Sequence, residues 1–115
     1  RKVHADIDIS SHLQSVQLYS IFERICLALT CQRLITIKKH NHSIHKNVEP
    51  LGLILTNTEL YLIYRTEAIK HMPISHIHTI DVSTFLFDYP DGFNLESYNL
   101  LFSNKLIIGK PSIKT

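Results

Sequence analysis

The sequence has few of the residues and none of the runs that mark several classes of protein. Its 115 residues include 3 glycines and 4 prolines, which excludes a collagen-like chain or a linker. No apolar run approaches the roughly 20 residues of a membrane-spanning helix, so no transmembrane segment is expected. Hydrophobic residues make up 44% and charged residues 19%, which excludes a chain disordered by low hydrophobicity. This length and composition predict one globular domain, or part of one.

Cysteine is scarce, and its spacing argues against a structural role. Cys26 and Cys31 are the only cysteines. On a helix they would lie about 140° apart around the axis, so a mutual disulfide is not expected. They also lack the C-x-x-C spacing of zinc ribbons and thioredoxin-like sites. We expect two buried thiols in a reducing, intracellular compartment.

Motifs of catalysis are missing too. The sequence contains no Gly-x-Ser-x-Gly elbow, His-Glu-x-x-His helix, P-loop or Gly-x-Gly-x-x-Gly, and its few glycines leave little for a phosphate-cradling loop. Asp88 and Asp91 fall in a turn, where aspartate is favoured for bonding its own backbone. A sequence pI of about 8.6 is low for a nucleic-acid-binding domain. We expect no enzyme, no cofactor and no nucleic-acid partner.

The start of the chain carries no recognisable targeting signal. It opens at Arg1 without an initiator methionine, and it lacks the basic, apolar and small-residue order of a secretory signal. We therefore expect a segment excised from a larger protein that is cytoplasmic and peripheral to membranes at most.

What the chain does have is clear periodicity. Apolar and polar residues alternate over 2–9, which predicts a short strand. Ser11-x-x-Gln14 then has the form of a capping box. A one-sided apolar arc follows, so a long amphipathic helix is expected over 11–32, covering one face of a sheet. The arc consists of Leu18, Tyr19, Ile21, Phe22, Ile25, Cys26 and Leu29.

Beyond this helix, short runs rich in Ile, Leu and Tyr predict antiparallel strands. Turns are expected at Asn57-Thr58, at Tyr89-Pro-Asp-Gly92 and at Ser103-Asn104. The predicted fold class is α+β, with a mostly antiparallel sheet or partial barrel over 34–109 and one long helix near the N-terminus, in a single domain over 1–115. The predicted strands cover 34–38, 51–56, 60–65, 77–87, 98–103 and 105–109.

Charge is separated along the chain although the formal total is only +2. From Arg24 to Val48 there is no acidic residue, whereas from Asp81 to Glu96 there is no lysine or arginine. The near-neutral total therefore conceals a basic loop and an acidic loop. The basic stretch holds Arg24, Arg33, Lys38, Lys39 and Lys46 with His40, His42 and His45.

The hairpin Leu53-Ile-Leu-Thr56, turn, Leu60-Tyr-Leu-Ile63, followed by Met72-Pro-Ile-Ser-His-Ile77, resembles the pleckstrin-homology and GRAM type of PH-like domain. The resemblance covers about 51–82 and implies a PH-like fold. It also implies that the hairpin before this stretch, with its loop over 39–47, corresponds to the one with which phosphoinositide-binding members hold lipid headgroups. The resemblance assigns the headgroup-binding role to Lys38, Lys39 and Lys46, and less directly to Arg65.

The chain differs from the PH-like pattern in three respects. It lacks the arginine-x-arginine element of strong headgroup binders, it places a strand and a long helix before the sheet, and it lacks the C-terminal helix that closes the PH barrel. We expect the N-terminal helix to do that covering, or the domain to extend beyond residue 115.

Several readings of the basic loop remain open at this stage. Lysines at 38, 39 and 46 would attract phosphates, and His40 and His42 would add charge as the pH falls below about 6.5. A solvated loop that only aids solubility is the alternative. His40-x-His42 and His76-x-His78 also have a spacing used by some zinc sites, but without further ligands no metal is expected.

The sequence thus predicts a non-catalytic, PH-like interaction module. The first hypothesis is that it binds phosphoinositides or an anionic membrane surface through Lys38, Lys39, Lys46, His40, His42 and Arg65. The second is that it is an adaptor or scaffold domain that binds another protein through a sheet edge or the acidic loop, without lipid. Because histidine is concentrated in the basic loop and in 69–82, binding there is expected to depend on pH.

Overall fold

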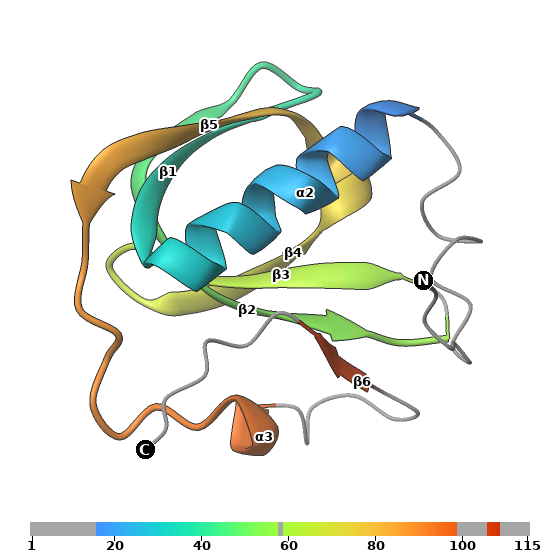
Figure 1. The fold of residues 1–115 in the computed structure, drawn as a ribbon. Coiled ribbons are helices and arrows are strands. Elements are labelled where there is room, and N and C mark those ends of the chain that lie inside the picture. The colour runs from blue at the N-terminus through green and yellow to red at the C-terminus, as the bar shows by residue number, and fades with distance from the viewer. Residues whose placement is uncertain (1–15, 58, 99–105, 109–115) are drawn as a thin grey trace.

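A computed structural model describes residues 16–57, 59–98 and 106–108 of the chain (Figure 1). These residues form an antiparallel sheet in the order β4-β3-β2-β1-β5, with β6 also paired to β2, and a long helix on the N-terminal side. The predicted α+β class is therefore confirmed. The elements are α2 (Val16–Cys31), β1 (Arg33–Lys39), β2 (Ile44–Leu55), β3 (Leu60–Arg65), β4 (Ile69–Pro73), η1 (Ile74–His76), β5 (Ile77–Leu86), α3 (Leu95–Tyr98) and β6 (Leu106–Ile108).

Strand β2 joins the two parts of the sheet. Its first half pairs with β1 as far as Val48, and its second half pairs with β3 from Glu49 to Leu55. Strand β6 pairs with β2 only at 53–55, after β1 has ended. The β2–β3 register shifts between Pro50 and Gly52, and Figure 1 shows the β1–β5 pair turning away from the β2–β3 layer. One long strand thus bends the sheet around the helix.

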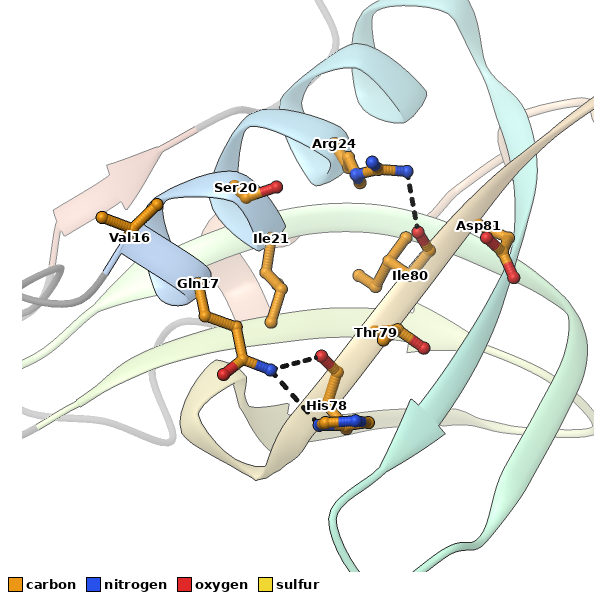
Figure 2. A pocket seen from close by; sticks show the side chains of 9 residues that line it. All are labelled: Val16, Gln17, Ser20, Ile21, Arg24, His78, Thr79, Ile80 and Asp81. Atoms are coloured by element: carbon orange, nitrogen blue, oxygen red, sulfur yellow. Dashed lines mark hydrogen bonds between the residues drawn. The ribbon is translucent and has the colours of Figure 1, made fainter.

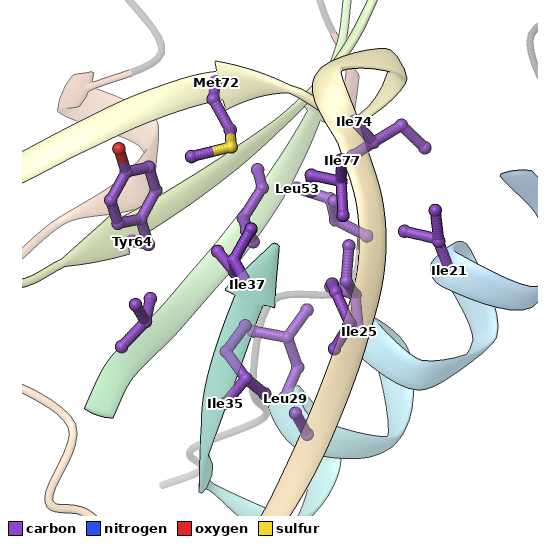
Figure 3. Close-up of a cluster of buried hydrophobic side chains, with 14 of the residues drawn as sticks. Ile21, Ile25, Leu29, Ile35, Ile37, Leu53, Tyr64, Met72, Ile74 and Ile77 are labelled. Carbon is purple, nitrogen blue, oxygen red and sulfur yellow. The ribbon is translucent and has the colours of Figure 1, made fainter. Parts of the chain in front are cut away.

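Helix α2 fills the hollow of this bent sheet. Its residues Ile21, Ile25, Ala28 and Leu29 recur at helical spacing and are buried, so one stripe of the helix faces the strands. Figure 3 shows this stripe against Ile35 and Ile37 of β1 and against neighbouring side chains of β2, β3 and η1. The main core lies here, and it anchors both β1 and the segment that leads into β5.

A second, smaller core covers the opposite side of β2 and β3. Leu51, Ile54 and Ile63 point to this side, and Leu95 of α3 packs on them with several aromatic residues. The Tyr89 hydroxyl donates to the backbone oxygen of Leu51 at 2.8 Å, and burial raises the pKa of Tyr89 to about 12. The aromatic residues around this core are Tyr61, Phe87, Tyr89, Phe93 and Tyr98.

One predicted turn and the predicted bend are found with small differences. The amide of Phe93 donates to the backbone oxygen of Pro90 at 3.3 Å and Gly92 has φ +78°, so the turn expected at 89–92 lies one residue later, at 90–93. The break in alternation between Ile74 and Ile77 is the 3₁₀ turn η1. Strand β4 was not predicted as a separate element, because its five residues, which include Pro73, carry little apolar alternation.

Other predictions need correction. The loop expected over 39–47 is a turn of four residues, because β2 begins at Ile44 and not at 51. The acidic loop is not one loop either, since Asp81 lies within β5. Tyr98 ends helix α3 and does not begin a strand. The strand over 2–9, the first helical residues at 11–15 and the strand and turn over 99–104 lie outside the described residues.

Two side chains of α2 are more open than its apolar arc predicts. Tyr19 is 50% exposed, because it lies at the edge of the stripe and not at its centre. Cys31 is exposed whereas Cys26 is half-buried, so only one of the two expected buried thiols is covered. Cys31 is the last residue of the helix, where the strands no longer cover it.

Gly52 gives the first testable prediction. A Cβ atom at this position would lie 2.5 Å from a methyl carbon of Leu95, so the Leu95 side chain would have to move out of its packed position. We expect Gly52→Ala to lower the free energy of unfolding by about 1–3 kcal/mol, the usual cost of overpacking. Leu95→Ala alone should also destabilise, through the cavity it leaves.

A double-mutant cycle in urea checks this contact. In the Gly52→Ala/Leu95→Ala protein the added methyl group enters the space vacated by leucine, so the two costs should not add. Additive losses would show that the two residues do not press on each other.

The cysteines give a second prediction. Burial and the nearby charge of Glu23 raise the pKa of Cys26 to about 11, so at pH 8 only about one Cys26 in a thousand is the reactive thiolate. A thiol-reactive dye should therefore label one site quickly in the folded protein and the second only in denaturant. Cys31→Ser should remove the fast phase, and Cys26→Ser should leave it intact. Two equally fast sites would contradict the burial of Cys26.

Candidate functional site

The turn between β1 and β2 is tightly closed by its own hydrogen bonds. The amide of Lys39 donates to Ser43 and the amide of His42 donates to Lys39, both at 2.9 Å. The side chain of Asn41 accepts from the amide of Ser43 at 3.0 Å, and His42 takes the left-handed conformation with φ +72°. The turn residues therefore hold a defined shape at the tip of the hairpin.

The lysines of this hairpin divide between its two faces. Lys38 lies opposite Ile44, and Lys46 follows two residues later on the same strand, so these three side chains share one face. Lys38, Ile44 and Lys46 are exposed, whereas Lys39, on the other face, is half-buried. Two of the three predicted lysines thus form an exposed basic face, and the third points elsewhere.

Lys39 lines a pocket between the hairpin turn and η1. This pocket, which we call the hairpin pocket, has a volume of about 350 Å³ and is lined by Lys39, His40, Asn41, Ser75 and His76. All five side chains carry hydrogen-bond donors, and three of them are basic. The nearby acid is Glu59, whose carboxylate accepts a hydrogen bond from the Ser75 hydroxyl at 3.2 Å. The lining itself contains no carboxylate, which suits an anion.

Histidines connect the two walls of the hairpin pocket. The amide of His40 donates to the backbone oxygen of His76 at 3.1 Å, so the turn is fastened to η1. The ring of His40 also lies against the ring of His78 at the start of β5, with centroids 5.2 Å apart. One histidine of the first His-x-His pair, His40, therefore meets both histidines of the second pair, a contact that the sequence analysis did not predict.

Arg65 lies away from this region. It pairs with the side chain of Glu49 through two of its nitrogens, beside the middle of β2. Since Glu49 neutralises it there, we leave Arg65 out of the site. His42 is exposed in the turn and does not line the pocket.

The sequence missed part of the lining. Asn41, Ser75 and His76 were not among the predicted binding residues, because a hydrophobic pattern gives no sign that η1 returns to the hairpin turn. The one available signal was the matched His-x-His spacing at 40–42 and 76–78. That spacing was considered only as a possible zinc motif, from which no metal was expected, and not as a contact between the two segments.

A second hollow lies beside the first, between α2 and the edge of β5 (Figure 2). This hollow, which we call the helix groove, has a volume of about 300 Å³. The Gln17 amide donates to the backbone oxygen of His78 at 2.7 Å, and Arg24 donates to that of Ile80 at 3.3 Å. Two helix side chains thus occupy backbone acceptors on the open edge of the sheet.

Further along β5 the edge is interrupted by a bulge. The register with β1 shifts between Val82 and Leu86, and the amide of Phe85 donates to the Ser83 hydroxyl at 2.9 Å. Such devices reduce the ability of an edge strand to pair with another chain. The bulge leaves the side chains of Phe85 and Leu86 exposed, at 71% and 67%.

Comparison with known proteins shows a similar fold in a solved structure but no matching family. No protein-family model and no curated protein matches the chain. A solved structure of proteasome accessory factor B/C (PafBC) of Arthrobacter aurescens is similar, with a TM-score of 0.60 and 22% identity. The match covers 74% of this chain but only 14% of that one, so it concerns a small part of PafBC.

Two features are absent from the part of the chain that the structure describes. Within 16–57, 59–98 and 106–108, no three histidine, cysteine or acidic residues are grouped so that they could hold a metal ion. No helix in the same ranges is long and apolar enough to cross a membrane.

Proposed function

We propose that this chain is a non-catalytic, PH-like interaction module that binds phosphate-bearing anionic headgroups at the hairpin pocket. The observation that carries the proposal is the pocket lining, which combines Lys39, His40 and His76 with Asn41 and Ser75. Lysine binds phosphate as a point charge, and neutral donors complete the shell of a phosphate oxygen. The antiparallel sheet with a basic hairpin agrees with the predicted PH-like character.

Lys38 and Lys46 have a different part in this proposal. They stand on the exposed face of the hairpin and not in the pocket, so they attract an anionic surface without holding one phosphate. Each lysine near an anionic membrane contributes about 1 kcal/mol, which salt weakens. Recruitment is therefore weak and salt-sensitive, and selectivity comes from the pocket.

A second candidate is binding of another protein at the bulge of β5. The exposed Phe85 and Leu86 are the observation that favours it. Addition of a partner strand along the rest of the edge is disfavoured, because Gln17 and Arg24 already occupy the backbone oxygens of His78 and Ile80. Such a partner would contact side chains of the bulge.

Vesicle co-sedimentation tests the headgroup proposal. Binding to phosphatidylcholine vesicles with a few per cent phosphatidylinositol bisphosphate should exceed binding to pure phosphatidylcholine, and it should fall as salt is raised. Lys39→Gln should weaken it about fivefold or more, since 1 kcal/mol is about a fivefold change in affinity.

Lys70→Gln is the matched control. Lys70 is an exposed lysine on β4 that lies near Glu67 and lines neither hollow, so its loss should change binding little. Equal and negligible binding to both kinds of vesicle would rule out the headgroup function. Equal losses of vesicle binding in the Lys39→Gln and Lys70→Gln variants would show that the binding is non-specific charge attraction.

Binding should also depend on pH. The titratable and charged side chains around the pocket are His40, His76, His78, Lys39 and the carboxylate of Glu59. Histidine is the side-chain type whose charge ordinarily changes between pH 8 and pH 6. Affinity for the phosphoinositide vesicles should therefore rise on acidification, and His76→Gln should reduce the rise. His42→Gln should not, because His42 lies outside the pocket. Equal affinity at pH 6 and pH 8 would contradict this assignment.

A further inference from the structure

The helix groove has the chemistry of a second anion site. Arg24 and His78 contribute basic groups to it, and Gln17 and Ser20 contribute neutral donors. Arg24 is exposed and uses one nitrogen for the backbone oxygen of Ile80, so most of its five N–H donors face the groove or solvent. Figure 2 shows Arg24 and Gln17 reaching from the helix toward β5 at the two ends of the groove.

Gln17 orients the imidazole of His78. The side-chain amide nitrogen of Gln17 donates one hydrogen to the backbone oxygen of His78. The same nitrogen lies 3.3 Å from Nδ1 of the His78 ring, and it can only donate there as well. Nδ1 must then accept, so the neutral ring carries its proton on Nε2. His78 therefore offers an N–H donor on the side of the ring away from Gln17, without needing a positive charge.

The groove and the hairpin pocket share a wall. His78 lines the groove, His40 lines the pocket, and their rings lie 5.2 Å apart. The hydrogen bond from His40 to His76 keeps this wall in place. Two hollows with basic and donor linings are thus placed side by side.

One acid also borders the groove. Asp81 is opposite Thr36 in the β1–β5 ladder and lies two residues beyond Thr79, on the face of β5 away from the buried Ile80. Figure 2 shows its carboxylate on the far side of the strand from Gln17 and His78. Asp81 therefore limits anions to the part of the groove beside the helix.

From this arrangement we infer that the two hollows together bind one compact ligand with two phosphate groups. One group lies in the hairpin pocket against Lys39, and the other lies in the helix groove against Arg24, with the His40–His78 pair between them. This inference rests on the proposed function, because it extends the same site. Two linked phosphates bind more tightly than one, since the second engages at a high effective concentration once the first is held.

Calorimetric titration of the purified chain with inorganic phosphate and with a soluble inositol bisphosphate tests the inference. The bisphosphate should bind at least tenfold more tightly than phosphate. Arg24→Gln should remove most of this advantage while the hairpin pocket still binds phosphate, whereas Lys39→Gln should weaken both ligands. Arg24→Lys, which keeps the charge but loses the planar fork, should fall between the wild type and Arg24→Gln.

The outcomes separate this inference from the proposed function. No binding of either soluble probe or of phosphoinositide vesicles would overturn both. Binding of both probes with no advantage for the bisphosphate, or an advantage that Arg24→Gln leaves intact, would overturn only the two-phosphate site. Equal affinity for the soluble bisphosphate and for the same headgroup in vesicles would identify the headgroup as sufficient, whereas tighter vesicle binding would assign part of the affinity to the membrane surface.

NMR gives a readout that does not depend on a folded Arg24 variant. In the wild-type chain, the ring signals of His78 should shift on titration with the bisphosphate but little with inorganic phosphate. The signals of His76, which lines only the hairpin pocket, should shift with both. Ring shifts confined to His76 with the bisphosphate would contradict the inference.

Discussion

The bend in β2 is the constraint on which the rest of the molecule depends. This strand of 12 residues pairs with β1 through its first half and with β3 through its second half. The β2–β3 register shifts between Pro50 and Gly52, where one pairing has given way to the other. Because the sheet turns there, α2 can bury its apolar stripe against both parts, and Leu95 can pack on the back of β2 above Gly52. The turn of the β1–β2 hairpin meets η1, and the hairpin pocket forms between them.

Sequence patterns were reliable where the information is local. The 3.6-residue periodicity predicted α2, the apolar runs of the hairpin predicted β3 to the residue, and Pro90 with Gly92 predicted a turn. Each of these depends on residues only a few positions apart, so the chain itself carries the signal. The length of β2 was underestimated because its first half contains only two apolar residues, Ile44 and Val48, among polar ones.

The candidate site depends on separations that no local pattern contains. His40 meets His76 and His78 across more than 35 residues, and Gln17 meets His78 across 61. Net charge along the chain correctly drew attention to the hairpin, but it could not show that Lys38 and Lys39 face opposite ways or that Glu49 holds Arg65. Those facts arise from register and from packing, and both require the folded sheet.

Gln17 and Arg24 have a consequence for solubility. By occupying backbone oxygens on β5, they cover part of an edge at which another copy of the chain could pair. Loss of either side chain would therefore expose a backbone template for self-association, and substitution at either position costs protection from aggregation.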